Sequence, residues 1–108
     1  MASAFVNKRS NPSAATLTTL YTVPASTQGL ISTLTICNRS ATPTSFRIAV
    51  RPLGASIDDS HYLYYDVAIA GNDTFSFTIG AALIATDVVS VYATLATLTF
   101  TAFIQEFT

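Results

Sequence analysis

The residues that could perform acid–base, nucleophilic or metal chemistry are few and poorly grouped. His61 is the single histidine, and Asp58 and Asp59 precede it in a predicted loop. General acid–base catalysis needs such groups beside a nucleophile, and no nucleophile stands at a motif spacing from them. The two aspartates also lack the pattern of oxygen ligands that surrounds a calcium ion. We therefore expect His61 to be a surface or strand-start residue, and we expect no enzyme activity and no bound metal.

Thiol and cofactor chemistry have no better candidates. Cys37 is the one cysteine, so an internal disulfide is excluded. Its place in the middle of an alternating segment predicts a small core side chain rather than a reactive thiol. Zinc lacks a ligand set, and the isolated glycines exclude a phosphate-binding glycine loop, so we expect no cofactor.

The composition argues against nucleic acid and membranes as partners. Only 10% of the 108 residues are charged, against about 25% in an ordinary soluble domain, and the net charge is −1. Five basic side chains cannot neutralise a long phosphate backbone. The longest apolar run, 79–85, is far below the roughly 20 residues of a membrane helix, and the first residues lack a signal-peptide core. We expect a protein made in a cytoplasm.

The few charges are divided along the chain. All basic residues lie in the first half, and all acidic residues, from Asp58 to Glu106, follow them. The two groups could face each other within one chain, pair between neighbouring copies, or be scattered by chance over the surface. A chain with so little charge must cover itself with hydroxyl side chains, here 17 threonines and 11 serines, or be covered by a partner.

The elements that would position these residues are short β-strands. From residue 16 onward, β-branched and aromatic runs alternate with turn residues, which is typical of an all-β sandwich or barrel. Two alternating faces predict two packed antiparallel sheets, jelly-roll or immunoglobulin-like, without deciding between these topologies. Residues 81–86 are expected to be a connection or one helical turn, and 95–97 a hairpin turn. The strands, about seven, are expected over 16–23, 28–38, 45–51, 61–69, 74–79, 87–95 and 97–107.

Alternation also assigns faces. In the strand 28–38, Leu30, Leu34 and Ile36 share one face. In the strand 61–69, Leu63, Tyr65, Val67 and Ile69 are expected opposite Tyr62, Tyr64 and Asp66. The last strand directs Phe100, Ala102 and Ile104 one way and Phe103 and Phe107 the other. Aromatic residues on both faces predict cover on both sides, by the core and by either the N-terminal segment or another subunit.

Residues 1–15 differ from the rest of the chain. They combine the adjacent basic residues Lys8 and Arg9 with asparagine, serine and proline, and they show no amphipathic period. We interpret 1–15 as an extended N-terminal arm, not a strand, followed by a sandwich domain over 16–108. Such an arm is either a floppy tail or a segment that orders on a neighbouring subunit.

Five short blocks follow one another along residues 17–107. They are Leu20–Tyr21–Thr22–Val23–Pro24–Ala25, Ile36–Cys37–Asn38–Arg39–Ser40, His61–Tyr62–Leu63–Tyr64–Tyr65–Asp66, Asn72–Asp73–Thr74–Phe75 and Asp87–Val88–Val89–Ser90–Val91–Tyr92–Ala93. In order and spacing these blocks resemble a small family of virion-associated β-sandwich proteins of tailed bacteriophages, frequent in phages of cyanobacteria.

The resemblance implies a non-enzymatic structural protein of the virion. A cement or decoration protein that clamps the major capsid protein suits a small chain with an arm, and a neck, baseplate or tail-fibre component is the alternative. On a tail fibre, the tyrosine-rich strand would be a sugar platform. We expect the arm to lie across the capsid protein and the strand aromatics to join copies into dimers or trimers. The expected interface residues are Phe5, Lys8, Arg9, Tyr62, Tyr64, Phe103 and Phe107.

Overall fold

The computed structural model describes residues 2–108, which form nine strands, two short 3-10 helices and no α-helix. The strands are β1 (Ser3–Ser10), β2 (Thr18–Thr22), β3 (Gln28–Asn38), β4 (Thr44–Arg51), β5 (Tyr62–Ile69), β6 (Thr74–Phe77), β7 (Ala81–Leu83), β8 (Val88–Ala93) and β9 (Leu98–Phe107). The 3-10 helices η1 (Pro52–Gly54) and η2 (Asp59–His61) both lie in the connection between β4 and β5.

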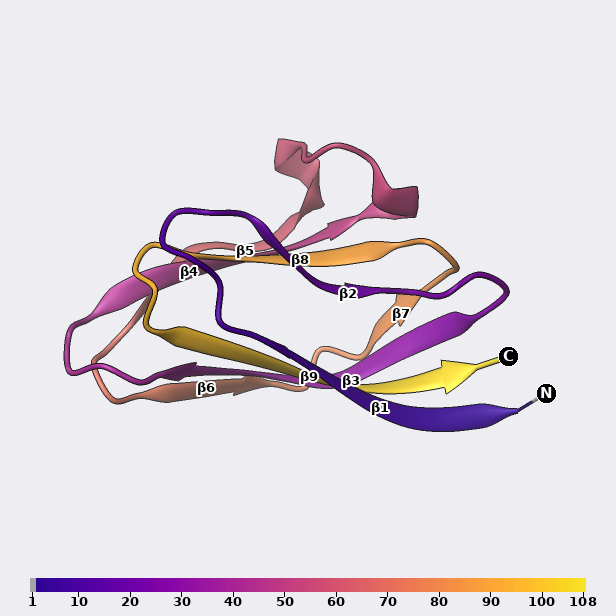
Figure 1. The fold of residues 1–108 in the computed structure, drawn as a ribbon, viewed down its shortest axis with the longest axis horizontal. Helices are drawn as coiled ribbons and strands as arrows, with labels where there is room; N and C mark the ends of the chain where they lie inside the picture. Colours follow the sequence, from indigo (N-terminus) through magenta and orange to yellow (C-terminus); the bar gives the residue numbers. More distant parts are fainter. Residues whose placement is uncertain (1) are drawn as a thin grey trace.

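Two antiparallel sheets pack face to face, as Figure 1 shows. Sheet A has the order β1-β9-β3-β6, with β7 also paired to β3, and sheet B has the order β2-β8-β4-β5. The chain changes sheet at every connection except β4–β5 and β6–β7. The two-sheet all-β sandwich expected from the sequence is therefore confirmed, with nine strands where about seven were expected.

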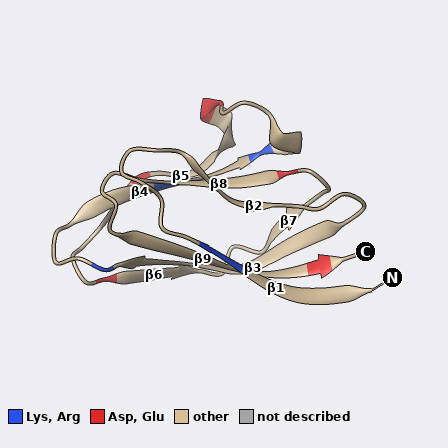
Figure 2. Ribbon diagram, in the orientation of Figure 1, with Lys and Arg blue, Asp and Glu red and all other residues tan. Residues whose placement is uncertain are grey.

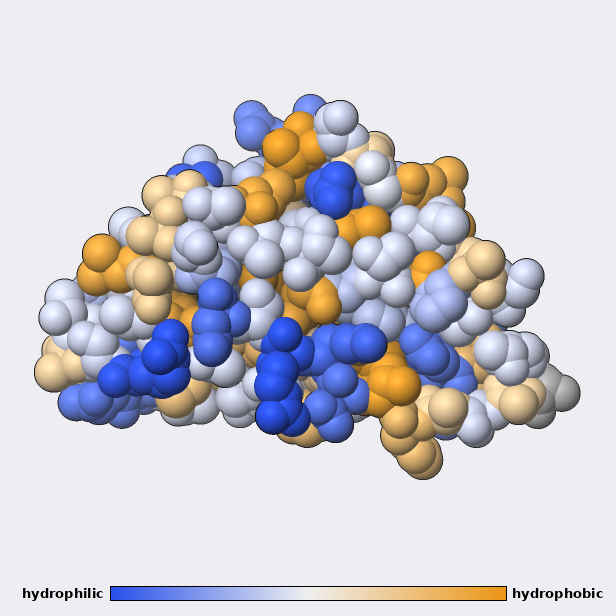
Figure 3. Space-filling view, in the orientation of Figure 1, coloured by the Kyte–Doolittle hydropathy of each residue, from blue (hydrophilic) through white to orange (hydrophobic). Residues whose placement is uncertain are grey.

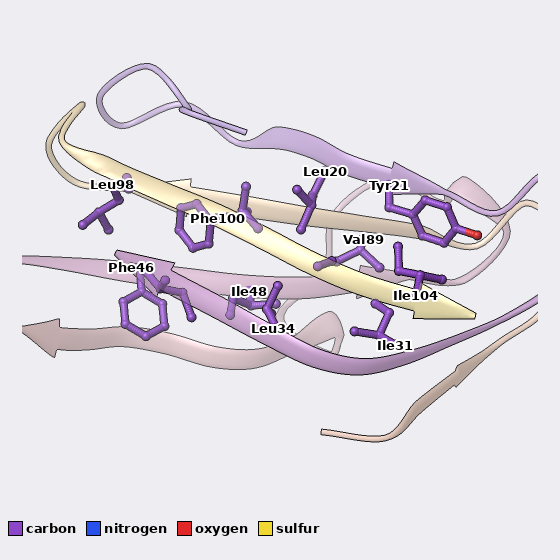
Figure 4. Close-up of a cluster of buried hydrophobic side chains, with 14 of the residues drawn as sticks. Leu20, Tyr21, Ile31, Leu34, Phe46, Ile48, Val89, Leu98, Phe100 and Ile104 are labelled. Carbon is purple, nitrogen blue, oxygen red and sulfur yellow. The ribbon is translucent and has the colours of Figure 1, made fainter. Parts of the chain in front are cut away.

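The core between the sheets is aliphatic and aromatic (Figure 4). Phe46, on β4, is fully buried and lies 6.0 Å, 6.3 Å and 6.1 Å, between ring centroids, from Phe75, Phe77 and Phe100. These three rings belong to β6 and β9 of sheet A, so a single side chain of sheet B contacts two strands of the facing sheet. Burying an aromatic ring contributes about 1.5–3 kcal/mol to folding, which makes this contact a main tie between the sheets.

The expectation that residues 1–15 contain no strand is wrong. Ser3–Ser10 pairs with β9 of its own chain over its whole length, and Ala14 bridges to Ala93. Thr99 Oγ1 also donates a hydrogen bond to Asn11 Oδ1 at 2.7 Å. An edge strand with both faces near solvent needs no apolar alternation, because backbone hydrogen bonds to its neighbour hold it. Because β1 has no apolar alternation, the sequence pattern does not identify it as a strand.

Two other local expectations are also wrong. Residues 95–97 do not join a hairpin, because β8 belongs to sheet B and β9 to sheet A, and the chain crosses between the layers there. The segment after Gly80 is the strand β7, which pairs with Gly29, Leu30 and Ile31 of β3. Three residues are too few to show a period in the sequence, and a cross-layer turn lacks its own residue pattern.

Bulges explain the misassigned side-chain faces. The pairing of β3 with β9 shifts between Ile31 and Thr33, so Ile31 is buried and Leu30 faces outward opposite Gln105. Each extra residue reverses the alternation beyond it, because side chains repeat with a period of two. Cys37 is half-buried beside Thr99 on the outer face of sheet A, and the prediction of a core cysteine is wrong.

A second irregularity reverses the side-chain alternation within β5. Its pairing with β4 shifts on both sides of Ile48, and Asp66 adopts a left-handed φ of 52°. As a result Tyr64 is half-buried and stacks on Phe77, while Tyr65 is 56% exposed, the opposite of the expected faces.

One polar contact ties the two sheets near the C-terminus. Tyr21 Oη, on β2, donates a hydrogen bond to Glu106 Oε2, on β9, at 2.5 Å. Burial raises the pKa of the Tyr21 hydroxyl, and the hydrogen bond to Glu106 and the nearby carboxylate raise it further. The folded state therefore favours the neutral tyrosine.

This arrangement predicts how Tyr21→Phe behaves with pH. Losing the hydrogen bond should lower the free energy of unfolding by about 1 kcal/mol near neutral pH. A folded-state pKa raised above the ordinary value of 10.0 contributes stability that is complete below pH 10 and falls as the pH rises above it. Urea titrations of both proteins through the alkaline range should show the wild-type advantage shrinking and then reversing. An advantage independent of pH would contradict the contact.

Candidate interaction surfaces

The residues considered above for acid–base or metal chemistry have structural roles. Asp58 Oδ2 accepts hydrogen bonds from the backbone N–H and the hydroxyl of Ser60, which lower the pKa of the Asp58 carboxyl. His61 Nδ1 accepts the Asp58 backbone N–H at 3.1 Å, completing a capping box around η2. Across residues 2–108, no three His, Cys, Asp or Glu side chains come close enough together to hold a metal ion. Asp58 and His61 therefore shape a loop.

A tyrosine–arginine cluster lies on the outer face of sheet B. Its members are Arg47 on β4, Tyr62, Tyr65 and Asp66 on β5, and Tyr92 on β8. The Arg47 Cζ atom lies 4.2 Å from the centroid of the Tyr65 ring and 4.3 Å from that of Tyr92. A guanidinium held between two aromatic rings gains from cation–π attraction on both faces.

The cluster is fixed by an ion pair. Arg47 Nε and Nη2 donate to Asp66 Oδ1 and Oδ2 at 2.6 Å and 3.3 Å. The hydrogen bond to Asp66 is the main reason that the pKa of Arg47 is raised. Tyr62 and Tyr65 meet edge to face at 4.9 Å, and with Asp59 they line a shallow recess. The cluster thus offers aromatic faces, hydroxyls and a carboxylate to a ligand, but no nucleophile with a base.

A second surface, here called the Phe5 surface, lies on the outer face of sheet A. It consists of Phe5 and Asn7 on β1, Ser32 on β3, and Phe103 and Gln105 on β9, which line one shallow recess. Phe5 is 83% exposed and Phe103 is 45% exposed. Figure 3 shows one face of the molecule, on which strongly hydrophobic and strongly hydrophilic residues are interspersed with weakly coloured ones. Phe5 and Phe103 are the two phenylalanines among the large hydrophobic side chains that are exposed between residues 2 and 108.

The predicted interface residues divide among these places. Phe5 and Phe103 share one recess, and Phe107 lines another one with Ile84. Lys8 and Arg9 occupy consecutive positions of β1 and so point to opposite faces of sheet A, which means that they do not form a joint basic patch. Tyr62 belongs to the tyrosine–arginine cluster.

Tyr64 is the exception among the predicted residues. Its ring stacks on Phe77 at 4.4 Å, on the core side of sheet B. The cluster members missed by the sequence analysis are Arg47, Tyr65, Asp66 and Tyr92. The outward position of Arg47 follows from alternation in β4, but the bulge in β5 hides Tyr65, and no local pattern connects Tyr92 with either.

The division of charge along the sequence becomes mixed in the fold. Figure 2 shows basic and acidic segments spread over both sheets and the loops. Arg47–Asp66 is the one salt bridge between residues 2 and 108, and it joins the basic and acidic halves within one chain. Arg51 instead donates to Ser90 and to the Ala55 carbonyl, and Arg39 to the Ala96 carbonyl. Charge pairing between copies is not needed to explain these side chains.

No protein-family model matches the sequence, and no curated protein matches it at a significant level. Between residues 2 and 108 the structure has no helix with the length and apolar character needed to cross a membrane.

A double-mutant cycle tests the cluster. Arg47→Met keeps a long side chain but removes the guanidinium with its ion pair and its cation–π contacts, and Asp66→Asn removes the carboxylate. Because both side chains are partly exposed, we expect a coupling of about 0.5–1 kcal/mol in the free energy of unfolding, reduced by salt. Denaturant titrations of the four proteins at low and high salt measure it. A coupling near zero at low salt would mean that the ion pair does not hold the cluster.

Proposed function

We propose that this chain is a non-enzymatic structural protein of a tailed-phage particle, and most specifically a cement or decoration protein that binds the major capsid protein. In this proposal the chain acts in the virion after synthesis in the host cytoplasm. It stabilises the shell by many weak contacts repeated over the capsid lattice, where avidity multiplies the effect of each contact.

The observation that carries the proposal is the exposed aromatic pair of the Phe5 surface. Large aromatic side chains that protrude from an otherwise polar surface are typical anchors of protein interfaces. Phe5 and Phe103 line one recess together with the polar residues Asn7, Ser32 and Gln105, and interface anchors commonly have such polar neighbours. The small, weakly charged β-sandwich and the resemblance of the sequence blocks to phage virion proteins support the same reading.

The structure changes how the proposal is best tested. Deleting residues 2–13 would remove β1 from sheet A and uncover β9, so lost binding would be ambiguous. Phe103→Ala instead truncates a side chain that is 45% exposed, and its effect on folding should be small. Leu63→Ala is the matched control, because Leu63 is similarly exposed at 50% but lies on sheet B.

Particles that lack the chain would be incubated with each purified protein, and bound copies counted. We expect Phe103→Ala to bind with roughly thirtyfold lower affinity, corresponding to an anchor worth about 2 kcal/mol. Leu63→Ala should bind like the wild type. Equal binding by all three proteins would exclude the Phe5 surface as the capsid contact.

The tyrosine–arginine cluster favours a second candidate function. In a neck, baseplate or tail-fibre accessory protein, this cluster would bind carbohydrate, since tyrosine rings stack on sugar faces, tyrosine hydroxyls donate and accept hydrogen bonds, and carboxylates accept them. Tyr62, Tyr65 and Asp59 line the recess on this face, with Arg47 held rigidly behind Tyr65.

Glycan-array binding tests this alternative. If the cluster binds sugar, Tyr65→Ala should abolish binding, and Tyr64→Phe should retain it because Tyr64 packs against Phe77 on the core side. Absence of any glycan binding by the wild-type protein, or binding that survives Tyr65→Ala, would reject the cluster as a sugar site.

A further inference from the structure

The edge of β1 differs from the other sheet edges of the described residues. β1 pairs with β9 in one unbroken register from Ser3 to Ser10, and six of its eight residues are exposed. At the other edges, β2 and β5 carry register shifts, and β6 and β7 have four and three residues. Bulges, short strands, prolines and charged side chains are the usual means of preventing edge-to-edge pairing. β1 is eight residues long, has no bulge or proline, and carries only the charges of Lys8 and Arg9.

The hydrogen bonds show which backbone groups β1 offers. Ala2 and Thr108 exchange both of their backbone hydrogen bonds, at 3.1 Å and 2.8 Å. In an antiparallel pair, bonded and non-bonded positions alternate. The even-numbered residues of β1 therefore bond to β9, and the N–H and C=O groups of the odd-numbered residues point to the open edge. The odd-numbered residues are Ser3, Phe5, Asn7 and Arg9.

We propose that two copies of this chain pair through β1, antiparallel about a two-fold axis at Val6, so that sheet A continues from one copy into the other. In this register Ser3 pairs with Arg9 of the second copy, and Phe5 pairs with Asn7. Each of the four edge-facing residues then exchanges both of its backbone hydrogen bonds. The inference goes beyond the proposed virion role and does not depend on it.

The side chains favour this register over its neighbours. A two-fold axis perpendicular to the sheet keeps outward residues outward. Phe5 of one copy then lies diagonally across from Phe5 of the other copy, and the Phe5 surface continues across the dimer. Arg9 faces Ser3 and Lys8 faces Ala4, so no like charges are directly opposed. A two-fold axis at Asn7 would pair Ser3 with a residue beyond the strand, and an axis at Phe5 would pair Arg9 with one. Either register would lose backbone hydrogen bonds.

The first test is the mass of the full chain by sedimentation equilibrium. We expect it to rise with concentration from 11.5 kDa towards twice that value. Asn7→Pro removes an N–H that faces the open edge and leaves the bonds to β9 intact. Because the substitution is present in both copies, the dissociation constant of the dimer should rise at least about tenfold. Asn7→Thr keeps the N–H and should dimerise like the wild type, and circular dichroism confirms that each variant is folded.

A cross-linking test shows directly which residues of the two β1 strands are opposite each other. It does not depend on whether the protein folds with a proline at position 7. In a Cys37→Ser background oxidised with glutathione disulfide, Val6→Cys should form a linked dimer, because the two Val6 side chains are opposite each other. Lys8→Cys alone should not link, whereas a mixture of Lys8→Cys and Ala4→Cys should. A monomer at every concentration, a dimer unaffected by Asn7→Pro, or Lys8→Cys linking as readily as Val6→Cys would overturn the proposal. The last two results would indicate exchanged strands or an interface formed by the exposed aromatics.

Discussion

Strand β9 is the element on which both the core and the surface depend. It lies between β1 and β3 in sheet A, and its residues Phe100, Ala102 and Ile104 are buried against sheet B. The residue between the last two, Phe103, is 45% exposed on the outer face. Because successive side chains of a strand alternate in direction, the packing that fixes the buried set also fixes the direction of Phe103. The core packing of β9 thus sets the outward direction of Phe103.

The fold class could be predicted because several segments of the sequence alternate between apolar and polar residues. In β9 the buried residues follow this period of two along most of the strand, and repeated short segments of this kind suffice to indicate a sandwich. The departures have physical causes. β1 is held by backbone hydrogen bonds without an apolar face, and the irregularities in β3 and β5 insert residues that reverse the alternation. Single-residue irregularities leave no clear mark in a sequence.

The candidate surfaces were predictable to a different extent. The outward direction of Phe103 follows from alternation in β9, and the structure adds Phe5 beside it. The tyrosine–arginine cluster depends on tertiary pairing: Arg47, Tyr65 and Tyr92 belong to three strands and meet only when β5 and β8 flank β4. Both surfaces present exposed aromatic rings, which supports the proposal of a protein that acts by contact.

The copy number of the chain in purified virions tests the proposed capsid role most directly. Quantitative mass spectrometry of intact particles compares peptides of this chain with peptides of the major capsid protein. A decoration protein repeats with the lattice, so the account predicts a number close to that of the capsid subunits or a simple fraction of it. Absence of the chain from the particle, or a number as small as that of neck or tail components, would contradict it.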